Sequence, residues 1–146
     1  MAEQVKGKWS SFSIEIITPE RVVVDEQMEG VVIPSTEGLL GILRNHAPFI
    51  GTLDIGVIKY LQSGSRHYVA CDAGVFEMKD NVLRILTDSA ERGESIDVAR
   101  AKQAKERAER RIQQRSEDLD HLRAELALRR SLARLNAAEA SGARKN

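Results

Sequence analysis

The chain has 146 residues, of which 42% are hydrophobic and 4% aromatic, so it can form one ordinary domain with an aliphatic core and an appended segment. Its formal net charge is zero, which removes any global electrostatic argument for binding nucleic acid or anionic lipid. No apolar run is long enough to span a bilayer, and the N-terminus lacks the apolar stretch of a signal peptide. We therefore expect any contact with a membrane to be made through a partner.

Residues 1–90 predict an antiparallel β-sandwich. All three prolines and eight of the ten glycines lie in this part, and they separate short runs rich in β-branched residues. The runs are residues 12–16, 21–27, 30–35, 56–62, 66–72, 74–80 and 82–88. Turns are expected at 63–65 and 79–81. Cys71, the single cysteine, lies in an apolar run and is predicted to be buried.

Residues 91–146 predict a two-helix antiparallel hairpin that ends in a disordered tail. Neither glycine nor proline occurs between Glu94 and Ser141, and this part is net basic whereas residues 1–90 are net acidic. Ser95 is the expected N-cap of the first helix, which has a narrow seam rich in alanine. The break is expected near residues 116–118, and the second helix should continue to about Ala140.

The second helix carries two apolar stripes on opposite sides. One stripe consists of Leu119, Leu122, Leu126 and Ala133, and the other of Ala124, Leu128, Leu132 and Leu135. A helix in a simple hairpin needs a single apolar stripe. Two stripes predict either a helix that packs between two neighbours or a helix that changes neighbours between two states.

Each helix also carries a row of arginines with the same spacing. The rows are Arg100, Arg107 and Arg111 on the first helix and Arg123, Arg130 and Arg134 on the second. In an antiparallel hairpin that turns at residue 117, Arg100 faces Arg134 and Arg111 faces Arg123. The rows are either a solvated face or a socket for an anion, and guanidinium groups suit the oxygens of a polyphosphate. The pattern alone leaves both interpretations open.

Nothing else in the sequence indicates chemistry. The histidines His46, His67 and His121 are scattered, without a metal-ligand spacing. No glycine-rich phosphate-binding loop is present. We therefore predict no catalytic residue, no metal ligand and no cofactor in this chain.

Three segments resemble the epsilon subunit of F-type bacterial ATP synthases. They are "EGLLGILRNHAPFIGTL" (37–53), "GVFEMKDNVLRILTDSAERGESIDVARA" (74–101) and "RAELALRRSLARL" (123–135). The resemblance implies a non-catalytic subunit of the central stalk, peripheral on the cytoplasmic face of the cell membrane. Its β-domain would join the gamma subunit to the membrane ring of c subunits. Its hairpin would fold compactly or extend into the alpha/beta catalytic head and inhibit ATP hydrolysis.

A narrower resemblance concerns ATP as a regulatory ligand. Residues 96–101, "IDVARA", are similar to the Ile/Leu-Asp-x-x-Arg-Ala motif of epsilon subunits that bind ATP. The matching residues are Ile96, Asp97, Arg100 and Ala101, and further contacts of those relatives fall on Glu91, Arg107, Arg130 and Arg134. The resemblance implies that Glu91, Ile96 and Asp97 recognise adenine while the arginines hold the phosphates.

Two other interpretations remain. The hairpin can be a purely mechanical inhibitor that binds no ATP, or the chain can be an adaptor whose basic helices bind RNA. Zero net charge and few aromatic residues argue against RNA. The loop around 35–40 and His46 lies where relatives meet the ring, although Leu39 stands where some relatives carry an acidic residue. The segment "NHAP" can equally be a rigid structural turn.

Overall fold

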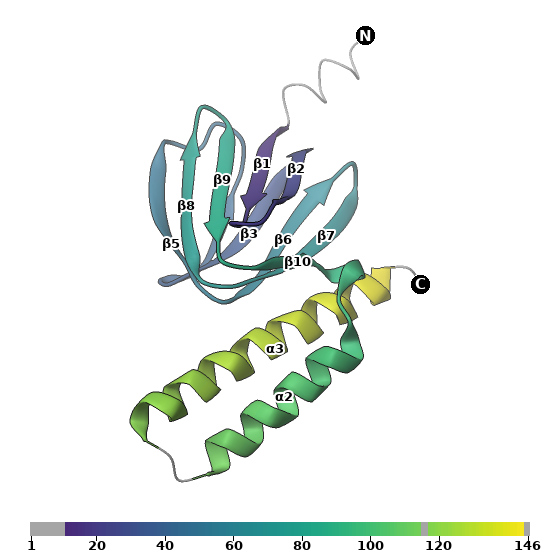
Figure 1. Cartoon of the computed structure of the whole chain (residues 1–146). Helices are drawn as coiled ribbons and strands as arrows, with labels where there is room; N and C mark the ends of the chain where they lie inside the picture. Colours follow the sequence, from purple (N-terminus) through teal and green to yellow (C-terminus); the bar gives the residue numbers. More distant parts are fainter. Residues whose placement is uncertain (1–10, 115–116, 145–146) are drawn as a thin grey trace.

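The computed structural model describes residues 11–114 and 117–144, in which a β-domain is followed by two helices (Figure 1). Within these residues the strands are β1 (Phe12–Ile17), β2 (Val22–Met28), β3 (Gly30–Ser35), β4 (Gly38–Ile42), β5 (Phe49–Leu53), β6 (Gly56–Gln62), β7 (Ser65–Cys71), β8 (Gly74–Lys79), β9 (Val82–Thr87) and β10 (Ala90–Arg92). A short 3₁₀ turn, η1 (Gly93–Ser95), leads to α2 (Val98–Gln113) and α3 (Asp118–Arg144). The predicted β-sandwich followed by a helical hairpin is confirmed.

The strands form one hydrogen-bonded sheet in the order β10-β7-β6-β3-β5-β8-β9-β1-β2, with β4 paired to β3. The sheet folds over on itself, so that β2 at one edge contacts both β6 and β10 (Figure 1). Most pairs are antiparallel, but β1 and β9 run parallel. The wholly antiparallel sheet that we predicted is therefore wrong at this pair. A parallel pair needs a long connection, and the pattern within one strand does not reveal the direction of its neighbour.

The sequence pattern does not predict β4, β5 and β10. Glycines interrupt both β4 and β5, and glycine is depleted from strands. Gly51 is nevertheless required in β5, because a Cβ at this position would overlap the ring of Phe76. The short strand β10 pairs with β7 and crosses the predicted domain boundary at residue 90.

The predicted turns between β6 and β7 and between β8 and β9 are confirmed. The central residues of each turn, 63–64 and 80–81, have positive φ angles, as in the type I′ turns that suit a twisted hairpin. Asn81 also fixes a distant loop, because its Oδ1 accepts from the Asn45 N–H at 2.7 Å and its Nδ2 donates to the Asn45 Oδ1 at 3.1 Å. Asn45, the first residue of "NHAP", is therefore held by the β8–β9 turn, which favours a structural role for this segment.

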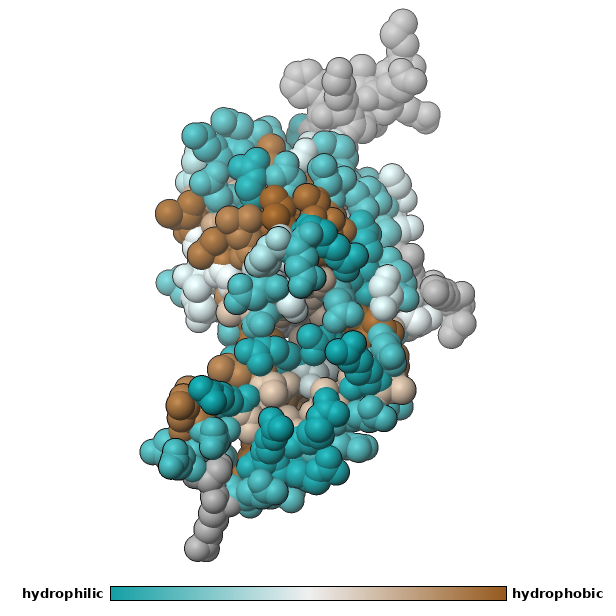
Figure 2. Space-filling model, viewed as in Figure 1, coloured by the Kyte–Doolittle hydropathy of each residue, from teal (hydrophilic) through white to brown (hydrophobic). Residues whose placement is uncertain are grey.

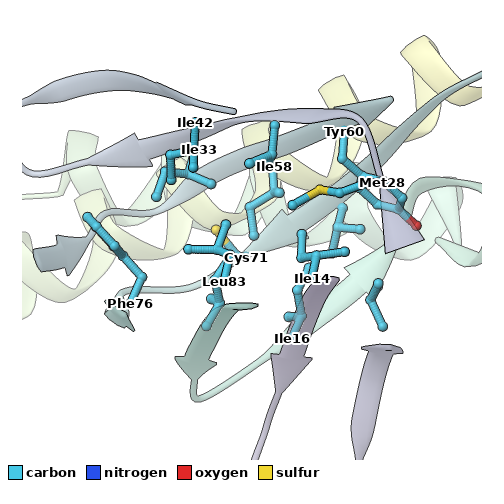
Figure 3. Close-up of a cluster of buried hydrophobic side chains, with 14 of the residues drawn as sticks. Ile14, Ile16, Met28, Ile33, Ile42, Ile58, Tyr60, Cys71, Phe76 and Leu83 are labelled. Carbon is cyan, nitrogen blue, oxygen red and sulfur yellow. The ribbon is translucent and has the colours of Figure 1, made fainter. Parts of the chain in front are cut away.

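The core of the β-domain lies between the two layers of the sheet and is mainly aliphatic (Figure 3). Phe12, Ile14 and Ile16 are buried and alternate with half-buried residues along β1, which is the predicted period. Burying one such side chain contributes about 1.5–3 kcal/mol. Cys71 is buried as predicted, and burial raises the pKa of its thiol to about 12.

The first helix begins later than we predicted. Asp97 is its N-cap, with a carboxylate oxygen that accepts from the Arg100 N–H at 3.1 Å, and the helix starts at Val98. Ser95 lies in the 3₁₀ turn η1 instead, so the prediction that it caps α2 is wrong. The alanine seam is confirmed, because Ala101 and Ala108 are buried. Small side chains on this seam let α3 approach closely.

The second helix is longer than we predicted. It continues past Ala140 to Arg144, and it occupies most of the segment for which the sequence predicts a disordered tail. This last part of α3 is helical because it packs against the end of the β-domain, where Ala137 and Ser141 are buried beside Gly93. Residues 145–146, and residues 115–116 of the predicted break, lie outside the described part of the chain.

Each stripe of α3 is only partly buried in this compact arrangement, because Leu119, Leu122 and Leu132 are exposed. Leu126 and Ala133 pack in a cluster with Ile55 and Ala70 of the β-domain. Ala124 lies about 180° around the helix from Ala133 and is also buried, on the side that packs against α2. Packing between two neighbours thus accounts for the buried members of each stripe, and a helix that changes neighbours between two states stays a prediction. Neither α2 nor α3 carries an apolar stretch that would let it cross a membrane.

Candidate functional site

A hollow of about 450 Å³ lies where β10, η1, α2 and α3 meet. It is lined by Glu91, Ser95, Ile96, Asp97, Arg100, Ala101, Ala104, Arg107 and Arg134. The structure therefore brings together seven of the eight residues that the resemblance implies for ATP, and only Arg130 is absent from the lining. Volumes of about 300–1,000 Å³ are typical of small-molecule sites.

The lining of the hollow carries charges of both signs. Arg100 and Arg107 are exposed on α2, and within residues 11–114 and 117–144 neither of them makes an ion pair. Ala104 lies between them on the same face and has no side chain to fill the space. The positive end of the α2 dipole also points here. These groups can hold an anion, whereas Glu91 and Asp97 can accept hydrogen bonds from amino groups.

The arginines of α3 lie at the junction between its two contact faces. Arg134 is about 80° around the helix from Ala124 and about 100° from Ala133, so it faces neither α2 nor the sheet directly. Its Nε donates to the Glu91 carboxylate at 3.0 Å, and both side chains are about one-third exposed. Charge on Arg134 is thus already compensated by a residue of the same hollow.

Arg130 has a different environment from the one we predicted. Its Nε donates to the Asp72 carboxylate at 3.1 Å, outside the hollow. The next arginine, Arg129, pairs with Asp54 at 2.8 Å. These partners could not be predicted from the helix pattern, because Asp54 and Asp72 are far from α3 along the chain. Ser95 and Ala104 also line the hollow and were absent from the predicted contact set.

Two of the predicted pairs of facing arginines each line a common hollow. Arg100 and Arg134 line the hollow described above, and Arg111 and Arg123 line a second hollow of about 340 Å³ near the hairpin end. The expected repulsion between the rows is reduced, because the arginines nearest the β-domain turn toward its carboxylates. Among the described residues, no group of histidine, cysteine and carboxylate side chains is arranged to hold a metal ion.

Comparison with known families covers almost the whole described chain. A family model described as "ATP synthase, Delta/Epsilon chain, beta-sandwich domain" matches residues 11–93, and its companion "long alpha-helix domain" matches residues 94–139. The chain belongs to the epsilon-chain family of ATP synthases.

Individual members of the family are similar over nearly their full length. The ATP synthase epsilon chain of Syntrophomonas wolfei is 47% identical over 131 residues, covering 89% of this chain and 96% of the relative. That of Symbiobacterium thermophilum is 48% identical over 132 residues, covering 90% and 95%. Among solved structures, a chain of the Euglena gracilis mitochondrial ATP synthase aligns with a TM-score of 0.75 at 21% identity, covering 90% of this chain and 81% of that one. This last similarity concerns the fold.

In this epsilon chain, a network of polar side chains anchors β10 just before the helices begin. Arg92 donates to the Glu26 carboxylate of β2 at 2.7 Å and to the Tyr60 hydroxyl at 3.3 Å, while the Tyr60 hydroxyl donates to Glu26 at 2.9 Å. Burial raises the pKa of Glu26, but hydrogen bonds from Arg92 and Tyr60 outweigh it, so the pKa is lowered overall. The strand that precedes the helices, β10, is thus held in place by this network.

A second surface of this epsilon chain is apolar and lies on the outside of the sheet. Figure 2 shows an apolar patch on the β-domain, in the region of β8 and β9. Val75 on β8 pairs with Leu86 on β9, Leu86 with Ile17 on β1, and Ile17 with Val22 on β2. Leu86 is 45% exposed and Val22 56%. An exposed apolar row across four strands is typical of a protein-binding surface.

Proposed function

We propose that this epsilon chain is a regulatory, non-catalytic subunit of the ATP synthase central stalk, and that it senses ATP through its hairpin. The observation that carries the proposal is the hollow between β10, η1 and the two helices. It gathers three arginines and two carboxylates from three separate parts of the chain. Guanidinium groups would hold the phosphates, while Glu91, Ile96 and Asp97 would contact the adenine.

In this proposal ATP favours the compact hairpin. The ligand contacts both helices and β10, so it binds the compact arrangement better than any arrangement in which the helices separate. Differential affinity of this kind is what shifts a conformational equilibrium. When ATP is scarce, the helices extend along the gamma subunit into the alpha/beta catalytic head and inhibit ATP hydrolysis.

The β-domain supplies the permanent contacts of the subunit. The apolar row from Val75 to Val22 is the surface that we assign to the gamma subunit. The end of the β3–β4 hairpin, which includes the exposed Leu39 of β4, is assigned to the membrane ring of c subunits. Through these partners the subunit couples rotation to proton transport and is peripheral on the cytoplasmic face of the membrane. A chain in the solved central stalk and c-ring of the Tetrahymena thermophila mitochondrial ATP synthase has a related fold, with a TM-score of 0.50 at 14% identity.

The test follows the distance between the hairpin and the β-domain by fluorescence transfer during titration with ATP. Dyes are placed at the exposed positions 37 and 106, since Cys71 is buried and does not compete for labelling. We expect saturable ATP-dependent transfer in the wild type and a roughly tenfold weaker midpoint in Arg107→Ala. Arg110→Ala is the matched control, because Arg110 is exposed on α2 but does not line the hollow. No saturable change at millimolar ATP would contradict the proposal.

A second candidate function keeps the inhibitory hairpin and omits ATP. One observation favours it: Arg134 is already paired with Glu91, so the compact hairpin is stabilised without a ligand. Removing the chain after residue 93 should increase ATP hydrolysis by the complex under both candidates. Only the ATP-sensing candidate predicts that inhibition by the full-length chain weakens as the ATP concentration rises. Hydrolysis rates of complexes with the full-length and the truncated chain, measured at several ATP concentrations, distinguish the two candidates.

A further inference from the structure

Three consecutive contacts join α3 to carboxylates of the β-domain. Arg129 pairs with Asp54, Arg130 with Asp72 and Arg134 with Glu91, at 2.8, 3.1 and 3.0 Å. These pairs stabilise the docked helix without a ligand. Two of the three arginines, Arg130 and Arg134, are among the eight residues that the resemblance implies for ATP, and of these two only Arg134 lines the hollow.

Asp72 is held firmly in position beside Arg130. Its side chain is 17% exposed, and its second oxygen accepts the Ala73 N–H at 2.8 Å. Because one carboxylate oxygen is hydrogen-bonded to the backbone, the other oxygen faces the guanidinium group of Arg130. The turn after β7 therefore positions Asp72 for its contact with Arg130.

The space around Arg130 is too small for a phosphate. Arg130 and Arg134 line a recess of only about 10 Å³, together with Asp72 and Ser89. This volume admits about one water molecule. Arg130 lies one helical turn from Arg134, which does line the larger hollow. To reach a ligand there, the Arg130 guanidinium must turn away from Asp72.

We infer that Asp72 is an affinity-determining residue of the ATP site, acting as an internal competitor for Arg130. A carboxylate and a phosphate accept the same donors of a guanidinium, and the Asp72 charge would also repel a phosphate brought beside it. The carboxylate thus occupies Arg130 when ATP is absent and must release it when ATP binds. The inference rests on the proposed ATP-sensing function.

The chain offers a closely matched control in Asp54. Asp54 likewise pairs with an arginine of α3 and likewise accepts a backbone N–H, that of Ile55, with its other oxygen. Its partner Arg129 lines neither the hollow nor the recess that Arg130 shares with Arg134. Asp54→Asn and Asp72→Asn therefore each remove one docking contact, and only Asp72→Asn releases an arginine that the ATP site would use.

The experiment is calorimetric titration of the full-length chain with ATP, for wild type, Asp72→Asn and Asp54→Asn. We expect the dissociation constant of Asp72→Asn to be roughly threefold lower than that of Asp54→Asn, as for a partly exposed ion pair. The difference should disappear when Arg130→Ala is present in both variants. Equal constants, or weaker binding by Asp72→Asn, would overturn the inference while leaving the ATP site itself intact.

The same titration separates this inference from the proposed function. If the wild type binds no ATP and Asp72→Asn does, competition by Asp72 is confirmed directly. If neither protein nor the Asp54→Asn variant binds ATP in the millimolar range, the ATP site is wrong and the inference falls with it. A difference that persists in the Arg130→Ala background would show that Asp72 acts by another route and would also overturn the inference.

Discussion

Gly93 and Ser141 lie in direct contact, at the point where the β-domain meets the C-terminal end of α3. A Cβ on Gly93 would overlap both the Ser141 hydroxyl and the Ala137 carbonyl oxygen. Ser141 is 5% exposed, and its Oγ has no hydrogen-bond partner among the described residues. The close approach of α3 therefore depends on the absence of a side chain at residue 93, directly after the anchored strand β10.

Gly93→Ala is expected to weaken docking of α3 on the β-domain. The overlap with the Ala137 carbonyl involves main-chain atoms, so no rotamer change relieves it, and overpacking of this kind costs on the order of 1–3 kcal/mol. Without ATP, the fluorescence transfer between positions 37 and 106 should fall, and amide exchange in α3 should become faster. Gly142→Ala is the control, because a Cβ there meets nothing within 4 Å. Equal transfer in the two variants would contradict the prediction.

The network around Glu26 predicts a stability that depends on pH. Its folded-state pKa is lowered by Arg92 and Tyr60, so the network stabilises the protein fully above the ordinary glutamate pKa of about 4.3. This contribution disappears as the pH falls through the lower folded-state pKa. The side chains of Arg92 and Glu26 are each about one-quarter exposed, so solvent weakens their interaction. Glu26→Gln should therefore lower the free energy of unfolding by about 1 kcal/mol near neutral pH.

Urea unfolding at several pH values measures this effect. The difference between wild type and Glu26→Gln should be largest near neutral pH and should disappear as the pH falls through the lowered folded-state pKa of Glu26. Glu15→Gln is the control, because the Glu15–Arg84 pair lies on the outer face of the sheet and is more exposed. Its loss should be clearly smaller. A Glu26→Gln difference that stays constant with pH would rule out the charge as the cause.

Asp97 has two roles that substitution can separate. It caps α2 through the Arg100 N–H, and it lines the hollow assigned to ATP. Asp97→Ala should remove the cap and cost about 1 kcal/mol of stability, whereas Asp97→Asn retains a capping oxygen and should cost far less. If Asp97 recognises adenine through its carboxylate, both variants should bind ATP more weakly. Thermal unfolding and ATP titration of both variants would show whether the affinity for ATP is lost with the helix cap, in Asp97→Ala alone, or with the negative charge, in both variants.

The sequence predicted those features that arise from local pattern. The alternation in β1, the turns at 63–65 and 79–81 and the alanine seam of α2 all follow from local sequence pattern. The parallel pairing of β1 with β9 could not be predicted in this way, because the contact joins distant strands. Gly51 illustrates a related difficulty: it weakens the strand pattern of β5, yet packing against Phe76 requires it.

The same distinction applies to the candidate site. The spacing of arginines along each helix was sufficient to predict that Arg100 and Arg134 line one hollow. It was not sufficient to predict which group pairs with Arg130, because its partner Asp72 lies in the turn after β7. Carboxylates of the β-domain therefore determine which arginines are free, and no pattern within the helices carries that information.

The apolar row on the outer face of the sheet predicts a surface whose change affects assembly and leaves the fold intact. Leu86 is 45% exposed at the centre of the row, so Leu86→Glu should alter the thermal unfolding temperature little. A charge at the centre of an apolar interface should weaken binding to the gamma subunit by at least about tenfold. Co-expression with the gamma subunit and gel filtration would measure the complex. Leu61→Glu is the control, because Leu61 is exposed on β6, which two strands separate from β8 in the sheet. If Leu86→Glu forms the complex as well as Leu61→Glu does, the gamma subunit binds elsewhere on this domain.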